Sequence, residues 1–263
     1  MTTSNKDIVS HFYDQLFSHG NLDVIDRYIG SEYINHNPNG GDGAESLRGF
    51  IKYFKGAHPQ MTHTVHRVLA ENDLVLLHSH AILDPGTPGQ AVIDIYRVED
   101  GKIVEHWDVI QRVPETTTSG NDMFTTLSDP AGPSPDPTVS STESKKVVLA
   151  FLDELTAKRD LTAYDRYVAG PYYQHNPTRV NGTAAEREGF VSAFATMPNL
   201  SIDVKRVIAD GDMVAVHIHF KPGPDDRGAA AMEFFRVRDG KVVEHWDAMQ
   251  PVPETSRNTN TMF

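Results

Sequence analysis

Apolar residues near the start of the chain recur three or four positions apart, which is typical of one face of a helix. They are Ile8, Val9, Phe12, Leu16 and Phe17. The same spacing returns in the second half at Val147, Val148, Phe151, Leu152 and Leu155. A short second helix is predicted at 22–28 and 161–167, and a third at 44–55 and 184–195. The third pair is offset by one residue more than the other elements, which predicts an insertion and a compensating deletion beside it.

After the helices, the apolar spacing changes to the alternation that is typical of strands. The predicted strands are 62–71, 74–83, 90–99 and 102–113, followed in the second half by 201–209, 213–220, 229–238 and 241–252. A short strand also precedes Pro38, and Asp-Gly sequences predict a tight hairpin between the last two strands of each half. Helices followed by an antiparallel sheet indicate the α+β class, with the helices over one face of the sheet.

The two halves share polar motifs as well as a pattern. His36–Pro38 recurs at His175–Pro177, and the string Asp100–Asp108 recurs at Asp239–Asp247 with a single change. Each pair of residue numbers differs by 139, which is about the size of a small domain. We therefore expect two copies of one domain at 1–115 and 143–263. The Thr-, Ser- and Pro-rich segment 116–142 is the expected linker between them.

Alternation along the strands separates the sequence-predicted polar residues by face. His78 and His80 share one face of their strand, and Asp94 and Tyr96 share one face of the next. The simplest arrangement packs the wholly apolar sheet faces of the two halves together, as an intrachain pseudo-dimer with further homo-oligomerisation left open. Each mixed face then lies beneath its own helices. Two sets of residues should converge there: His36, His80, Asp94 and His106 in the first half, and His175, His219, Glu233 and His245 in the second.

The hairpin register decides which residue faces Asp94. A three-residue loop with a glycine bulge sets Asp94 opposite His106, whereas a two-residue Asp-Gly turn sets it opposite Trp107. The first register is favoured here. We interpret Trp107 and Trp246 as core or interface aromatics, and Asn37 and Asn176 as residues that close a turn.

A carboxyl group in an apolar pocket has a raised pKa, and a neighbouring imidazolium lowers it again. Such a pair can exchange protons near neutral pH, as general acid–base catalysis requires. A zinc or iron site built on His-x-His and an acid is the rival interpretation. It has no third ligand at a motif spacing, so we expect neither a metal nor an organic cofactor.

Composition narrows the classes of partner. The formal net charge is −12 and neither half has a basic cluster, which argues against nucleic acid and anionic membranes as partners. The absence of cysteine excludes disulfides, thiolate metal sites and a cysteine nucleophile. Neither an apolar leader nor an apolar run of membrane length is visible, so a cytoplasmic protein is expected.

Three strings carry a resemblance to a known family: Tyr33–Pro38, the His78-Ser-His80 strand, and Asp94–Asp108. Both halves resemble the SnoaL-like branch of the NTF2-like superfamily nearly end to end. The resemblance implies two cones, each a curved antiparallel sheet wrapped around N-terminal helices. It also implies that pairs of cones form dimers through their sheets.

Characterised relatives are polyketide cyclases that close a ring by aldol condensation without a metal or cofactor. In them an Asp acts as base, assisted by a His fourteen residues earlier. His80 and Asp94 match that spacing here, as do His219 and Glu233. Ketosteroid isomerases share the cone but use an Asp before a Pro, where this chain has Asn37 and Asn176. Their first-helix Tyr is matched by Tyr13, whereas Leu152 stands there in the second half.

The favoured hypothesis is a cofactor-independent acid–base enzyme that acts on a small apolar carbonyl compound by proton abstraction, cyclisation or isomerisation. Asp94 and Glu233 are the predicted bases. The residues expected to contact the substrate are Tyr13, His78, Tyr96, His217 and Phe235. A non-catalytic small-molecule-binding protein is the alternative, and an epoxide hydrolase or dehydratase is a further one.

Overall fold

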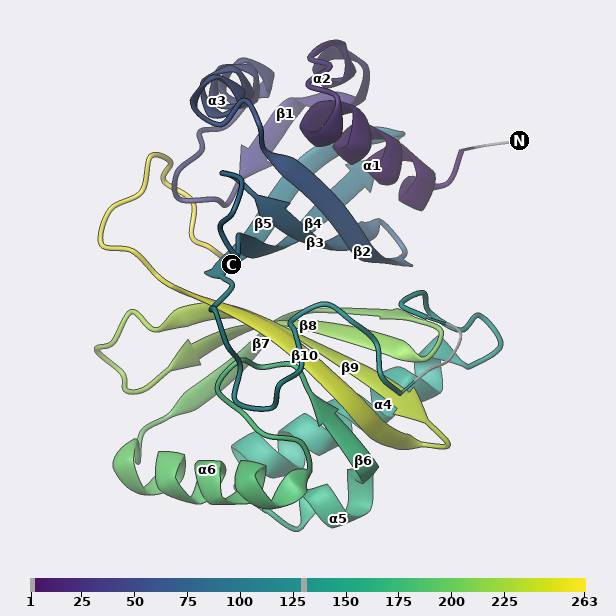
Figure 1. Cartoon of the computed structure of the whole chain (residues 1–263), viewed down its shortest axis with the longest axis vertical. Helices are drawn as coiled ribbons and strands as arrows, with labels where there is room; N and C mark the ends of the chain where they lie inside the picture. Colours follow the sequence, from purple (N-terminus) through teal and green to yellow (C-terminus); the bar gives the residue numbers. More distant parts are fainter. Residues whose placement is uncertain (1–2, 129–131) are drawn as a thin grey trace. The chain divides into compact units, whose positions relative to one another are not determined.

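The computed structural model describes residues 3–128 and 132–263, which form two compact units (Figure 1). Unit 1 comprises Met1–Arg112 and Pro253–Phe263, and unit 2 comprises Val113–Val252. Each unit combines helices with a five-stranded sheet, whose four longer strands all follow the helices, so the predicted α+β class with two similar units is confirmed. The prediction that the two sheets pack on each other stays a prediction.

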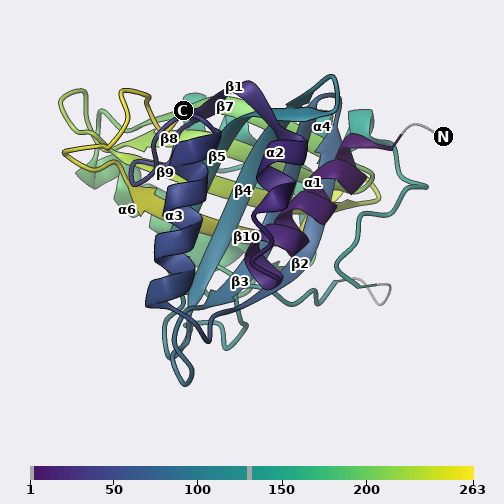
Figure 2. The ribbon, with the colours of Figure 1, turned by 90° about the horizontal axis from the view of Figure 1, so that it is seen from above.

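Unit 1 carries its helices over one face of its sheet, as Figure 2 shows for α1, α2 and α3 across the strands. The helical segments are α1 (Asn5–Tyr13), continued by the π-helical turn η1 (Asp14–Ser18), α2 (Asp23–Tyr28) and α3 (Ala44–Ala57). The strands are β1 (Ile29–Asn35), β2 (Thr62–Glu71), β3 (Leu74–Ile82), β4 (Gln90–Glu99) and β5 (Lys102–Arg112).

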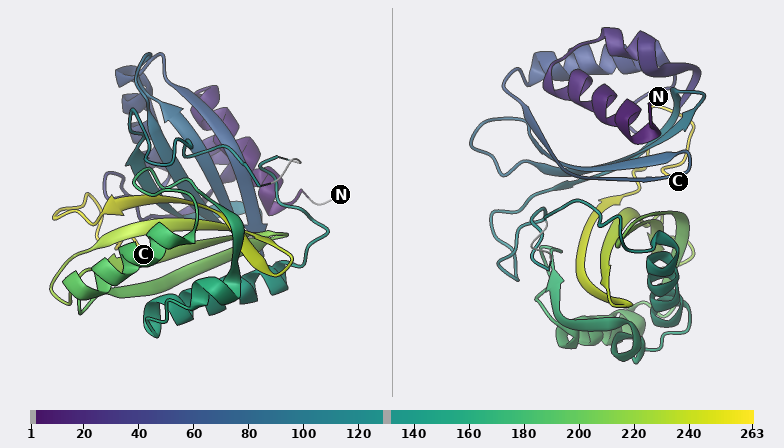
Figure 3. Two further views of the ribbon diagram at one scale, coloured as in Figure 1. Left: turned by 60° about the horizontal axis from the view of Figure 1, so that its bottom comes forward. Right: turned by 90° about the vertical axis from the view of Figure 1, so that its right-hand side faces the viewer.

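Unit 2 repeats this order, and Figure 3 shows its helices on one side of its sheet. Its helical segments are α4 (Ser141–Leu152), η2 (Asp153–Ala157), α5 (Ala163–Tyr167) and α6 (Thr183–Thr196). Its strands are β6 (Val168–Gln174), β7 (Ser201–Asp210), β8 (Met213–Lys221), β9 (Ala229–Arg238) and β10 (Lys241–Pro251). Both α3 and α6 span fourteen residues at an offset of 139, so the insertion and deletion predicted beside this helix are wrong. Among the described residues, no helix is long and apolar enough to cross a membrane.

The sheets are mixed rather than wholly antiparallel. Their strand orders are β1-β5-β4-β3-β2 and β6-β10-β9-β8-β7, and β1 and β6 pair in parallel with β5 and β10. The antiparallel prediction therefore holds only for the four longer strands of each unit. The parallel edge brings the end of β1 next to the middle of β5, because Asn35 pairs with His106.

The hairpin between β4 and β5 has a register that neither prediction anticipated. Asp100 and Gly101 both have positive φ, as a two-residue type I′ turn requires, and Glu99 pairs with Lys102. A bulge then follows, because Val98 pairs with Ile103 but Arg97 pairs with Glu105. The extra residue shifts the rest of the strand by one position. Asp94 consequently lies opposite Asp108, and not opposite His106 or Trp107.

The helices cover the sheet face that carries Val75 and Leu77, which pack with apolar residues of α1 and α2 in one core. In unit 2, Val214, Val216 and Ile218 take the same place. These residues belong to the face that was predicted to pack against the other sheet. The prediction for β4 is correct, since Tyr96 and Val98 join the core beneath the helices. For β3 and β8 the predicted faces are reversed.

The segments that follow the last strands are exchanged between the units. Residues 113–128 and 132–252 belong to unit 2, whereas Pro253–Phe263 belongs to unit 1. The predicted linker thus forms part of the second compact unit, although its residues 129–131 lie outside the described residues. The buried side chains of Met123, Phe124 and Met262 show why these tails dock.

Candidate active site

Unit 1 encloses a cavity of about 80 Å³ between its helices and the covered face of its sheet. Tyr13, Tyr96 and Phe50 are among the aromatic side chains that line it. Three ionisable side chains from the two central strands reach the same cavity: Asp94, His106 and Asp108. All three residues are at least 92% buried, so this is a polar cluster at the bottom of an apolar pocket.

The imidazole of His106 is held from both sides. Its Nε2 lies 2.9 Å from Asp94 Oδ1, and its Nδ1 lies 3.1 Å from Asn35 Oδ1. The amide of Asn35 is itself oriented, because its Oδ1 accepts a hydrogen bond from the Asn37 backbone N–H. Two acceptors on the two ring nitrogens suit an imidazolium, which donates from both. Burial lowers the pKa of His106, but the Asp94 hydrogen bond and the charges of Asp94 and Asp108 raise it above its ordinary value.

Asp108 is the second carboxyl group of the cluster. Burial raises its pKa to about 6, and the charge of Asp94 acts in the same direction. Asn37 donates a side-chain hydrogen bond to Oδ2 of Asp108. Oδ1 of Asp108 and Oδ2 of Asp94 are buried and have no hydrogen-bond partner among the described residues. One oxygen of each carboxyl group is therefore left for a ligand or for a shared proton.

Tyr13 adds a hydroxyl group beside this cluster. Its hydroxyl lies 2.8 Å from Ser79 Oγ and 3.3 Å from His63 Nδ1. Burial raises the pKa of Tyr13 well above its ordinary value, as does the charge of Asp94, so the phenol remains a donor. Burial lowers the pKa of His63 to about 4, which leaves that imidazole neutral.

Unit 2 has a counterpart of the same cluster in a cavity of about 200 Å³. His245 Nε2 lies 2.5 Å from Glu233 Oε2, and His245 Nδ1 lies 2.9 Å from Gln174 Oε1. Burial raises the pKa of Asp247 to about 7, reinforced by the charge of Glu233. Asn176 donates to Asp247 Oδ2 over 2.6 Å, as Asn37 does to Asp108.

In each unit, three of the four histidines that were predicted to line the pocket lie outside it. Cross-strand partners share a face, and Asp94 pairs with Leu77, whereas His80 pairs with Ala91. His78 and His80 therefore lie on the opposite face from Asp94, where His78 accepts a hydrogen bond from Arg67 and His80 donates to the carbonyl of Pro88. His217 and His219 are placed in the same way in unit 2. The prediction that these histidines share a face with Asp94 and Glu233 is therefore wrong.

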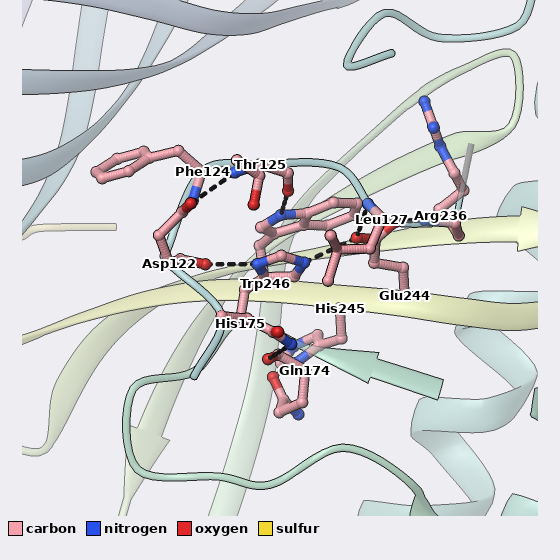
Figure 4. A network of polar contacts seen from close by, with 12 residues as sticks. Asp122, Phe124, Thr125, Leu127, Gln174, His175, Arg236, Glu244, His245 and Trp246 are labelled. Atoms are coloured by element: carbon pink, nitrogen blue, oxygen red, sulfur yellow. Dashed lines mark hydrogen bonds and ion pairs between the residues drawn. The ribbon is translucent and has the colours of Figure 1, made fainter. Parts of the chain in front are cut away.

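His36 and His175 also lie outside the pockets. His175 stacks on Trp246 with ring centroids 4.9 Å apart, contacts Glu244 Oε1 at 2.7 Å, and contacts the carbonyl oxygen of Asp122 at 2.5 Å. Figure 4 shows this group on one side of β10 and His245 with Gln174 on the other. His36 has the same neighbours in unit 1: Glu105, Trp107 and Thr261. These histidines anchor the exchanged tails.

The other predicted residues are in the pockets. Asp94, His106, Tyr13 and Tyr96 line the first cavity, and Glu233, His245 and Phe235 line the second. Sequence reasoning missed Asp108 and Asp247, although each ends the repeated string and was therefore visible as a pair. It also missed Asn35, Gln174 and the second function of Asn37 and Asn176, which close a turn and also hold an acid.

The predicted alternative metal site on His-x-His does not form, because those histidines face away from the acids. A different set of possible ligands is present in unit 1. Ligand atoms of Asp94, His106 and Asp108 all lie within 4.8 Å of one another. Two carboxylates and an imidazole could hold a divalent cation, but His106 Nε2 and Asp94 Oδ1 are already joined by a hydrogen bond of 2.9 Å.

Comparison with known proteins agrees with the repeat. The model of the SnoaL-like domain matches residues 9–106 and again residues 148–245. The chain belongs to the SnoaL-like domain family. Membership supports a general role in small-molecule cyclisation or isomerisation, and both copies of the family domain include their acid–histidine pair. No protein of curated function matches the chain.

Similar solved structures include wild-type IdmH, a putative polyketide cyclase from Streptomyces antibioticus. It is 25% identical, with a TM-score of 0.35, and the match covers 41% of this chain and 93% of IdmH. A putative polyketide cyclase from Acidithiobacillus ferrooxidans is 18% identical, with 43% and 92% of the chains covered and a TM-score of 0.36. TsrD from Streptomyces laurentii is 20% identical, with 42% and 91% covered and a TM-score of 0.36.

Proposed function

We propose that the chain is a cofactor-independent acid–base enzyme that removes a proton next to the carbonyl group of a small apolar compound. The observation that carries this proposal is an acid–histidine–acid cluster that lines a cavity in both units, buried in unit 1 and with only Glu233 partly exposed in unit 2. Polar groups this deeply buried are costly unless they are paired. Oδ2 of Asp94 and Oδ1 of Asp108 nevertheless have no hydrogen-bond partner among the described residues, and both residues line the pocket.

Asp94 acts as the base through Oδ2, the oxygen that His106 does not hold. It takes the α-proton of the substrate, and the electron pair of the broken C–H bond forms the enolate. Protonated Asp108 donates a hydrogen bond from Oδ1 to the enolate oxygen, and the phenol of Tyr13 is a second donor. The enolate carbon then attacks another carbonyl group of the same molecule, or is reprotonated elsewhere. Asp94 returns its proton to the product, so the reaction needs no oxidant or co-reactant.

In unit 2, Glu233, His245 and Asp247 take these parts. Leu152 stands where unit 1 has Tyr13, so the counterpart of that phenol is missing. The second pocket therefore relies on the protonated form of Asp247 to stabilise the enolate. Because its pKa is about 7, this form persists to higher pH than protonated Asp108.

The test uses α-proton exchange, which reports the proposed step without knowledge of the natural product. The full chain is incubated with acetophenone in D₂O, and deuterium incorporation into the methyl group is followed by NMR. The chain should accelerate incorporation over buffer. Asp94→Asn combined with Glu233→Gln should reduce the rate at least about 100-fold, because a base contributes roughly that much.

The matched control is Asp100→Asn with Asp239→Asn. These substitutions also change one acid to an amide in each unit, but in the exposed turns of the two hairpins, where asparagine tolerates the positive φ. The control should retain the full rate. Equal rates for the control and the pocket variant, with both folded by circular dichroism, would refute the assignment of the base.

A further inference from the structure

The walls of the two pockets differ at matched positions on one helix. In unit 1, α3 presents Leu47, Phe50 and Phe54 to the cavity. At the same offset of 139, α6 presents Glu186, Gly189 and Ala193. Two aromatic rings are thus replaced by a hydrogen atom and a methyl group, and a leucine by a carboxylate. The loss of the rings explains why the second cavity measures about 200 Å³ and the first about 80 Å³.

Glu186 is held inside the second pocket rather than at its surface. The residue is 94% buried, and Gln174 donates to its Oε1 over 3.0 Å. Arg179 Nε lies 4.0 Å from the same oxygen, but the Arg179 side chain is 41% exposed. The negative charge of Glu186 helps to raise the pKa of His245 and of Asp247, so it acts on the proposed acid–base cluster.

A second group of matched residues changes in the reverse sense. Tyr13, His63 and Ser79 supply polar groups to unit 1. Their matched residues are all aliphatic: Leu152, Ile202 and Ile218. Unit 1 therefore has polar groups around Tyr13 where unit 2 is aliphatic, and unit 2 has a polar group on α6 where unit 1 has a leucine on α3. A ligand that suits one pocket cannot satisfy the polar groups of the other.

We propose that the two pockets take different carbonyl compounds, an inference that rests on the proposed function. Unit 1 takes a compact aromatic ketone, which fits between Phe50 and the sheet. Unit 2 takes a longer ketone that carries a hydrogen-bond donor, a hydroxyl group or a protonated amine, at Glu186. The tandem chain thus carries two specificities instead of two copies of one.

The experiment measures binding to each pocket of the full chain by methyl NMR. Met249 lines the second cavity, and Ile110 lines the first at the matched position, so their labelled methyl groups report the two pockets separately. The probes are acetophenone and three acetonaphthones that carry an ethyl, hydroxymethyl or aminomethyl group at position 6. Acetophenone should perturb Ile110. The two donor-bearing probes should perturb Met249 and bind about tenfold more tightly than the ethyl probe.

Variants of unit 2 separate the effect of pocket size from the effect of the Glu186 charge. Glu186→Leu should remove the tenfold advantage, and Gly189→Phe should abolish binding of all three long probes at Met249 without changing acetophenone at Ile110. Glu186→Gln should keep the advantage of the hydroxymethyl probe and lose that of the aminomethyl probe, which separates the two donors. Glu188→Ala removes an exposed carboxylate from the same helix and should change nothing.

Equal affinity of the ethyl and donor-bearing probes, or an unchanged preference in folded Glu186→Leu, would overturn the inference. The proposed function fails separately, because binding needs no turnover. If the chain binds the probes with the expected preference but does not exchange their α-protons, the specificities stand and the catalysis does not.

Discussion

At the scale of single residues, two carboxyl groups of unit 1 share one buried pocket, where the charge of Asp94 disfavours ionisation of Asp108. Asp94 is held by His106, while Asp108 has a pKa of about 6. Sequence reasoning identified Asp94 and His106 through their repetition. It also placed His80 of the neighbouring strand beside Asp94, because alternation orders residues within a strand but does not relate the faces of two neighbouring strands.

Substitution of Asp108 predicts a change in the pH profile. Its pKa is raised above 3.8 by folding, so the protonated donor is present below about pH 6 and lost above it. In a Glu233→Gln background, where only unit 1 is active, α-proton exchange should fall as the pH rises through 6. Asp108→Asn keeps a neutral donor at every pH and should abolish this fall. A profile that falls equally in both proteins would contradict the role of Asp108.

The raised pKa of Asp108 also makes the stability of unit 1 depend on pH. A carboxyl group with a raised folded pKa contributes stability that is complete below its unfolded pKa and lost as the pH rises through its folded pKa. A difference of about two units corresponds to roughly 3 kcal/mol. Asp108→Asn should therefore stabilise unit 1 at pH 8 more than at pH 4, as measured by urea unfolding.

At the scale of elements, the helices and hairpins could be predicted, because their apolar spacing and turn residues are local signals. The register of β4 against β5 could not. A two-residue turn was visible in Asp100-Gly101, but the following bulge at Val104 leaves no local signature in the sequence. This one extra residue places Asp108 beside Asp94 and turns Trp107 away from the pocket. Helix α3 was predicted correctly as an element, but it was matched to α6 with an error of one residue. That error hid which residues of the two helices line the pockets at matched positions.

Deletion of Val104 tests the bulge. Without the extra residue, every position of β5 beyond it should move to the opposite face. Trp107 would then enter the pocket of unit 1 and Asp108 would leave it. We expect unit 1 to lose exchange activity and more than about 3 kcal/mol of unfolding free energy. Val104→Ala keeps the residue count and should retain activity; a deletion variant as active as Val104→Ala would show that the bulge does not position the site.

At the scale of the whole molecule, each unit is completed by the tail that follows the other repeat. Asn260 donates to the carbonyl of Asn35 and to Asp42 in unit 1. Asn121 makes the matched contacts with Gln174 and Asn181 in unit 2. Asn35 and Gln174 hold His106 and His245, so each tail supports a pocket. The repeated Met-Phe pairs hinted at docked tails, but the sequence carries no signal for which unit receives which tail.

Single substitutions in the tails should have crossed effects. Asn260→Ala should lower the exchange rate of unit 1 severalfold, and Asn121→Ala that of unit 2, because each removes two hydrogen bonds beside an oriented amide. The rate of each pocket is measured with the base of the other replaced, by Glu233→Gln or Asp94→Asn. Effects confined to the repeat that carries the substitution would contradict the exchange of tails between the two units.

The most direct test of the central claim is the rate at which the full chain places deuterium next to the carbonyl of acetophenone. Four proteins are compared: the natural sequence, Asp94→Asn, Glu233→Gln and the variant with both changes. Asp94→Asn should lose most of the rate, because unit 1 is the pocket proposed to take a compact aromatic ketone, whereas Glu233→Gln should lose only the smaller contribution of unit 2. The double variant should fall to the rate of buffer. A folded double variant that still exchanges at the natural rate would show that these carboxylates are not the bases.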